Sequence, residues 1–188
     1  MSESYPAGIS VQSSVRKYAV NSRRVTAILK MVGALCGIAA TQVNVLFVGP
    51  ERIRTLNQRF RNKDRSTDVL SFPIKDWPGP VQILKTPKTP RKLDFPDPLG
   101  DIVISLSDAE KNARHIGQSL SREVCFLLIH GFLHLCGHDH IQAKDETAML
   151  SAQRKLFLKL ARRRPAVWAG LIAAKSSAKS SRKNKCVI

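Results

Sequence analysis

The part of this chain that most constrains its fold is an apolar segment that ends in a cluster of histidines. From Ser119 the sequence reads SLSREVCFLLIHGFLHLCGHDH, and its apolar residues recur at the three- and four-residue spacing of a helix. Apolar residues also occur on the other sides of that helix, which predicts a buried central helix rather than a surface one. The segment is too short and too polar to span a bilayer.

The histidines of this segment have the spacing of metal ligands. His130 and His134 are four residues apart, so a helix places them on one face, one turn from each other. Gly137 can adopt a left-handed conformation that ends the helix, which would allow His140 to turn back as a third ligand. Three protein ligands leave a fourth position for water, as in catalytic zinc sites. We therefore expect one zinc ion on His130, His134 and His140.

Two neighbouring residues are alternatives to this ligand set. His138 would replace His140 as the third ligand if the helix continued past Gly137, because it follows His134 at the same spacing. A glycine at position 137 makes that continuation less favourable. Asp139 is better suited to orient a ligand than to bind the metal itself.

The spacing of His130, His134, Gly137 and His140 is the same as that in a zinc-peptidase motif. HExxHxxGxxH holds a zinc ion, and the glutamate after its first histidine is the general base. Gly131 stands at that position here and cannot accept a proton. A phosphodiester is a suitable alternative substrate, because zinc lowers the pKa of bound water to about 7 and neutralises charge on phosphate oxygens.

The charge of the chain indicates a polyanionic partner. Of its 188 residues, 31 are lysine or arginine and 14 are acidic, for a net charge of +17. Nucleic acid is the leading partner class, and an anionic membrane surface is the second. Alternatively, the charge forms a solvated basic face and a charged tail that bind no partner. No acidic residue follows Glu146. We expect one domain over residues 1–164 and a flexible basic tail over residues 165–188.

The remaining pattern predicts an α+β fold with a small mixed sheet of about four strands, surrounding helices and the zinc site on a central helix. A helix that starts at Gly49-Pro50-Glu51 should bury Ile53, Leu56 and Phe60. A proline-rich loop is expected over residues 76–98, and Ser107 or Asp108 should cap the helix that runs to Ile116. Strands are expected at 9–15, 43–49, 68–73 and 101–106, and further helices at 22–39, from 119, and at 143–163.

The cysteines and the chain ends exclude several other classes. Cys36, Cys125 and Cys136 lie in apolar surroundings and none belongs to a CxxC pair, so they are expected to be small hydrophobic residues. The first residues lack the pattern of a secretory signal, and the last four are not a prenylation box. The expected location is the cytoplasm.

Three segments resemble one known family. HGFLHLCGHDH, from His130, closely resembles the signature HGxLHLxGxDH of the YbeY endoribonucleases. LNQRFRNKDRSTDVLSFP, from Leu56, is similar to the second motif of the family, and PLGDIVIS is similar to its third. The segments occur in the order of the family and span roughly residues 43–160.

The resemblance implies a zinc-dependent endoribonuclease that is specific for single strands. It implies a role in ribosomal RNA maturation, at the 3′ end of 16S-type RNA in particular, and in ribosome quality control, with the small ribosomal subunit and its proteins as partners. It assigns catalytic roles to Arg61 and His130, although Phe60 departs from the tyrosine that usually precedes the arginine. The planar guanidinium of arginine binds phosphate through two donors.

Other basic residues near Arg61 have two interpretations, and two other functions are alternatives. Arg59, Lys63 and Arg65 could extend a phosphate track from Arg61, or be ordinary solvated charges at a helix end. His115 is expected on a helix surface. The alternative functions are a zinc peptidase-like hydrolase and a non-catalytic ribosome-binding factor with structural zinc.

Overall fold

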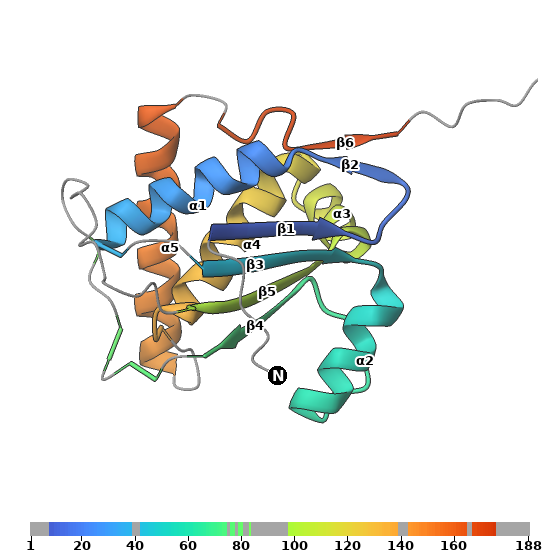
Figure 1. The fold of residues 1–188 in the computed structure, drawn as a ribbon, viewed down its shortest axis with the longest axis horizontal. Helices are drawn as coiled ribbons and strands as arrows, with labels where there is room; N and C mark the ends of the chain where they lie inside the picture. Colours follow the sequence, from blue (N-terminus) through green and yellow to red (C-terminus); the bar gives the residue numbers. More distant parts are fainter. Residues whose placement is uncertain are drawn as a thin grey trace, which may run out of the picture.

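The structure, a computed structural model, describes residues 8–38, 42–74, 76–77, 79–80, 83, 98–138, 143–164 and 167–175. Its centre is a four-stranded mixed sheet with the strand order β1-β3-β5-β4 (Figure 1). Strands β1, β3 and β5 are parallel, and β4 pairs antiparallel with β5 at one edge. The bounds are β1 Gly8–Ser13, β3 Gln42–Val48, β4 Val69–Pro73 and β5 Gly100–Ser105. The predicted α+β class and small mixed sheet are confirmed.

Side chains along a strand alternate between the two faces of a sheet. In this sheet, apolar side chains on both faces are buried against helices. Val45 and Phe47 of β3 belong to the main hydrophobic core, whereas Leu46 and Val48 belong to a second, smaller cluster. That second cluster includes the fully buried Ile53 of helix α2 (Pro50–Arg61). Helix α2 therefore covers one face, and the remaining helices enclose the main core on the other.

Helix α4 (Leu120–Leu135) is the central helix that the sequence predicts. It packs on β4 and β5 and also contacts α3 (Leu106–His115), α1 (Ser22–Cys36) and α5 (Ala143–Arg163). The Ser119 hydroxyl accepts a hydrogen bond from the Arg122 backbone N–H and caps its first turn. None of the helices in the described ranges combines the length and the apolar character that crossing a membrane would need.

Two expectations about local structure are wrong. Phe60, predicted to lie on the buried face of α2, is 57% exposed. The last turn of α2 extends past edge strand β4 (Figure 1). The Phe60 ring therefore meets the sheet at its edge, in a contact with Phe72, and the rest of the ring faces outward. The cap of α3 is also earlier than predicted: Ser105, rather than Ser107 or Asp108, accepts the hydrogen bond from the Asp108 backbone N–H.

Part of the segment that was expected to be a basic tail, residues 165–188, forms a strand. Residues 172–174 form strand β6 (Ile172–Ala174), which pairs antiparallel with β2 (Tyr18–Val20). Ile172 exchanges two hydrogen bonds with the Ser121 hydroxyl, and Leu171 is fully buried. Both strands have only three residues, so the alternating pattern that would predict them from the sequence is too short to recognise. Residues 176–188 of the expected tail lie outside the described part of the chain.

Candidate active site

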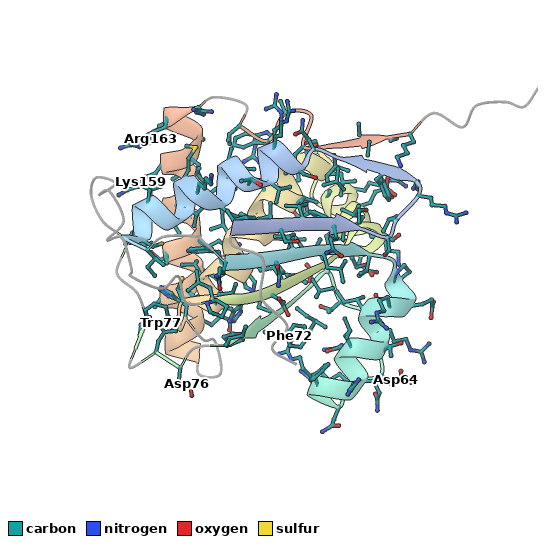
Figure 2. All side chains as sticks on the ribbon, viewed as in Figure 1. Asp64, Phe72, Asp76, Trp77, Lys159 and Arg163 are labelled. Carbon is teal, nitrogen blue, oxygen red and sulfur yellow. The ribbon has the colours of Figure 1, made fainter. Side chains whose placement is uncertain are left out.

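A cleft of about 910 Å³ runs along edge strand β4, between the end of α2 and the histidines of α4. Phe72 lies on β4, and Asp76 and Trp77 follow it on the same lower side of the molecule (Figure 2). Every residue of β4 contributes to the lining. The other lining residues are Phe60, Arg61, Lys63, Thr67, Asp68, Asp76, Trp77, His130, His134, Gly137 and His138.

His130 and His134 point their Nε2 atoms toward each other. These atoms are 3.2 Å apart. Two imidazole nitrogens bound to one tetrahedral zinc at 2.0–2.1 Å would be separated by about 3.3–3.4 Å. The observed separation is close to that value and is also a hydrogen-bond distance between the two ring nitrogens. The predicted convergence of these two rings is present on one face of α4.

Gln153 of α5 lies behind this pair and fixes the orientation of one ring. Its side-chain amide donates a 3.0 Å hydrogen bond to the Phe126 carbonyl, which can only accept. The other end of the amide, Oε1, therefore faces Nδ1 of His130 at 3.3 Å. An oxygen acceptor there favours the proton on Nδ1 and leaves the Nε2 lone pair directed into the cleft. This tautomer is the one that binds a metal through Nε2.

The described part of the chain is interrupted just before the predicted third ligand. Gly137 has a φ of 81°, and α4 ends before it, as predicted. His138 also lines the cleft, yet among the described residues no group of three histidine, cysteine, aspartate or glutamate side chains is placed to hold a metal. Asp139 and His140, the predicted orienting residue and third ligand, lie outside the described residues.

Gly131 marks the closest approach of α4 to the sheet. A Cβ atom at this position would lie 2.8 Å from Cγ2 of Ile102 on β5. The residue therefore faces the sheet rather than the cleft. A glutamate, which zinc peptidases have after the first histidine, has no room here without movement of α4.

Gly137 and Trp77 join the histidine end of the cleft to the segment after β4. A Cβ atom at Gly137 would lie 2.6 Å from Cβ of Trp77. The indole Nε1 of Trp77 donates a 2.8 Å hydrogen bond to the Leu135 carbonyl at the end of α4. That carbonyl belongs to the last turn of the helix, where backbone acceptors lack intrahelical partners.

The basic residues expected beside the site are divided between two surfaces. Arg61 and Lys63 line the cleft, whereas Arg59 lines a separate shallow hollow on α2 and Arg65 lines neither. All four side chains are exposed. Arg59 and Arg61 lie on α2, and the turn that carries Lys63 and Arg65 begins at Asn62, whose φ is 54°. Its geometry is reinforced by a two-point ion pair between Arg54 and Asp64, with N–O distances of 2.8 and 2.9 Å.

The wall of the cleft at the start of β4 is held by two carboxylates. Asp68 accepts hydrogen bonds from the Val69 backbone N–H at 2.9 Å and from Asn112 at 3.0 Å. Asp108 accepts hydrogen bonds from Ser66 and Ser105. Burial opposes ionisation of Asp108, but these hydroxyl donors together hold its pKa below the ordinary value. The network attaches the segment between α2 and β4 to α3.

Buried ionisable groups of α1 and α4 away from the cleft serve packing. Burial raises the pKa of Cys125, as it does that of Cys36, to about 12, so both thiols stay protonated. Burial, with a smaller contribution from Asp68, also raises the pKa of Glu123, although a hydrogen bond from Gln118 opposes the shift. The prediction that the cysteines are small hydrophobic residues agrees with their burial.

Sequence reasoning missed Gln153, Phe72 and Trp77 as parts of the site. Gln153 has a detectable signal: it is a polar residue in the buried stripe of α5, between Met149 and Leu156, and is 1% exposed. The other two become neighbours of the histidines only through the pairing of β4 with β5. His115, expected on a helix surface, is exposed at the end of α3.

Comparisons with known proteins agree on one family. A family model described as Endoribonuclease YbeY matches residues 10–161. The chain is 41% identical over 117 residues to Endoribonuclease YbeY of Bacillus cytotoxicus, an alignment that covers 62% of this chain and 70% of the relative. It is 42% identical to the protein of that name from Latilactobacillus sakei, with 62% and 72% covered. The solution structure of TM1509 from Thermotoga maritima matches with a TM-score of 0.53 and 27% identity, over 82% of this chain and 90% of that one.

Proposed function

Since this chain belongs to the YbeY endoribonuclease family, we propose that it is a zinc-dependent endoribonuclease that cleaves single-stranded RNA in the cleft along β4. Its proposed role is ribosomal RNA maturation in the cytoplasm, including 3′-end processing of 16S-type RNA, and ribosome quality control at the small subunit. The family membership and the net charge of +17 support an RNA substrate.

The observation that carries the proposal is the pair of Nε2 atoms 3.2 Å apart, with Gln153 behind one ring. We propose that His130 and His134 hold one zinc ion together with His140. A zinc ion there would supply a Lewis acid that polarises a phosphoryl oxygen and lowers the pKa of a water molecule. The protein supplies the orientation of the two rings, because α4 is anchored on the sheet and α5 fixes the tautomer of His130.

Arg61 and Lys63 supply the phosphate-binding side of the cleft in this proposal. Arg61 is the last residue of α2, and its side chain is exposed on the cleft wall. Its guanidinium can hold two oxygens of the scissile phosphate and stabilise the charge that builds on them. Lys63 extends the contact to a neighbouring phosphate. Arg59 and Arg65 are not part of the proposed track, because neither lines the cleft.

The peptidase alternative has no support from the packing of α4. The position that would need a glutamate is occupied by Gly131, against Ile102. The non-catalytic alternative predicts RNA or ribosome binding without cleavage, with zinc present. That outcome separates it from the proposed enzyme.

A cleavage assay on the purified zinc-loaded protein tests the proposal. Single-stranded RNA should be cut by the native chain and by Arg52→Ala, a matched loss of an exposed arginine on α2 outside the cleft. His130→Ala and Arg61→Ala should each reduce the rate by about 100-fold or more. Product ends identify the nucleophile: a 2′,3′-cyclic phosphate requires the RNA 2′-OH, and a 5′-phosphate requires water. Equal rates for all four proteins would contradict the proposal.

A further inference from the structure

Phe60 is an exposed aromatic ring at the rim of the cleft. Five large hydrophobic residues are strongly exposed in the described part of the chain: Phe60, Ile74, Ile116, Leu150 and Leu158. Among these five, only Phe60 is aromatic and only Phe60 lines the cleft. It immediately precedes Arg61, the proposed phosphate-binding residue. Single exposed apolar residues are common, so exposure alone does not indicate a function. The contacts of the ring and its neighbours in the cleft distinguish Phe60.

The Phe60 ring is held in place by the sheet. Its centroid lies 5.1 Å from that of Phe72, with an interplanar angle of 67°, which is an edge-to-face contact. Phe72 belongs to β4 and packs against the small core cluster that includes Ile53 and Val48. An exposed ring in contact with a partly buried neighbour that is itself packed on the core has already lost much of its rotational freedom. It can therefore stack on a planar ligand at a small cost in entropy.

Trp77 provides a second fixed ring at the other end of the cleft. Its indole nitrogen is hydrogen-bonded to the Leu135 carbonyl, and its Cβ lies where a side chain at Gly137 would collide. The side chain is half-buried and lines the cleft beside His134. Aromatic side chains thus occur both next to the phosphate-binding residues and next to the proposed metal ligands.

We propose that Phe60, supported by Phe72, and Trp77 form an aromatic platform on which unpaired nucleobases of the RNA stack. The proposal rests on the function proposed above and specifies how the substrate is selected. Stacking requires bases that are not already stacked in a duplex, and every base offers a planar face. The platform therefore selects single strands with little preference for sequence. Arg61 and Lys63 hold the backbone while the rings hold the bases.

Binding measurements on Phe60 variants provide the first test. A uridine-only single-stranded RNA is titrated in EDTA, which prevents cleavage, and a duplex of the same length serves as the comparison ligand. Phe60→Leu should weaken single-strand binding roughly 5- to 100-fold. It should leave duplex binding and the salt dependence unchanged, because no charge is removed. Phe60→Tyr, which keeps the ring, should bind like the native chain.

Two controls separate the outcomes. Ile116→Ala removes an exposed apolar residue that does not line the cleft, and it should bind RNA normally. Unchanged single-strand affinity in Phe60→Leu, or an equal loss for duplex and single strand, would overturn the platform. Failure of the native protein to bind or cleave single-stranded RNA would instead overturn the proposed function. Thermal unfolding of Phe60→Leu, an exposed site, should match that of the native chain.

The fluorescence of Trp77 tests the second ring. The chain has two tryptophans, and Trp168→Phe leaves Trp77 as the single reporter while preserving a ring against Phe157. Uridine RNA should quench this emission on binding, and an abasic ribose-phosphate strand of equal length should bind through its phosphates without quenching. Quenching by both strands, or by neither while RNA binding is observed, would remove Trp77 from the platform.

Discussion

The side-chain oxygen of Gln153 lies 3.3 Å from Nδ1 of His130, whose other ring nitrogen faces His134. This contact links α5 to the proposed metal ligands on α4. The Phe126 carbonyl holds the other end of the amide, so the orientation of Gln153 is determined by the backbone of α4 itself. A ligand whose tautomer is fixed in this way needs less reorganisation when a metal binds.

Replacement of Gln153 should therefore weaken zinc binding without removing a ligand. Gln153→Leu should lower the zinc affinity about 10- to 100-fold, the usual effect of losing the partner of a ligating histidine. Gln153→Glu keeps an acceptor at Nδ1 but loses the donor to the Phe126 carbonyl, so it should retain more of the zinc affinity than Gln153→Leu does. Competition with a chromophoric chelator measures both, and ¹⁵N NMR of the metal-free protein reports whether His130 carries its proton on Nδ1. Native zinc affinity in Gln153→Leu would contradict this role.

Loss of Arg61 should change the electrostatic part of RNA binding. Arg61→Ala removes one phosphate contact, so the slope of log K against log salt should become less steep by about 1. Arg61→Lys keeps the charge and should keep the slope, but it should cleave more slowly because a single ammonium cannot hold two phosphate oxygens. Fluorescence anisotropy between low and moderate salt measures the slope. The same slope in Arg61→Ala and Arg52→Ala would show that Arg61 does not contact phosphate.

Gly131→Ala should destabilise the fold at the contact between α4 and β5. The new Cβ would lie 2.8 Å from Cγ2 of Ile102, so the helix or the strand must shift, at a cost of about 1–3 kcal/mol. Gly79→Ala is the matched control, because nothing lies within 4 Å of its Cβ position. Urea unfolding measures the difference. A Gly131→Ala protein as stable as the control would show that the approach of α4 to the sheet is looser than described.

The sequence predicted the central helix and the two converging histidines because each depends on local spacing. Gly137 was identifiable as the end of α4 for the same reason. The exposure of Phe60 was not predictable from spacing: the residue continues the apolar stripe of α2, and only the end of the sheet at β4 leaves it uncovered. The roles of Phe72 and Trp77 depend on strand order, and that of Gln153 depends on how α5 packs on α4, so neither appears in local patterns.

The C-terminal residues should separate into a structural part and a dispensable part. Deletion of residues 165–188 removes β6 and the buried Leu171, and should reduce stability by roughly 2–5 kcal/mol. Deletion of residues 176–188 leaves β6 in place and removes four basic residues, so it should affect stability little while weakening RNA binding at low salt. Thermal unfolding and anisotropy separate the two effects. Equal stability of both truncated proteins would contradict a structural role for β6.

Glu123 should make stability depend on pH in the direction opposite to an ordinary paired carboxylate. Burial raises its pKa in the folded state above the ordinary value of 4.5, so between those two pKa values the folded chain binds more protons than the unfolded chain. The contribution of Glu123 to stability should therefore fall as pH rises through this window and then remain constant. Glu123→Gln removes the effect, so it should be more stable than the native chain at neutral pH and similar to it below pH 4.5.

Glu110 provides the opposite case within the same protein. It accepts hydrogen bonds from Lys17 at 2.9 Å and Tyr18 at 3.0 Å, and these partners, Lys17 first, lower its pKa. Glu110→Gln should therefore be less stable than the native chain at neutral pH, and the difference should disappear as pH falls through the lowered pKa. Urea unfolding of both variants from acidic to neutral pH measures the two slopes. Glu110 is held by its partners, whereas the pKa of Glu123 is raised mainly by burial. If stability changed with pH in the same direction at both sites, burial would not be the main influence on the ionisation of Glu123.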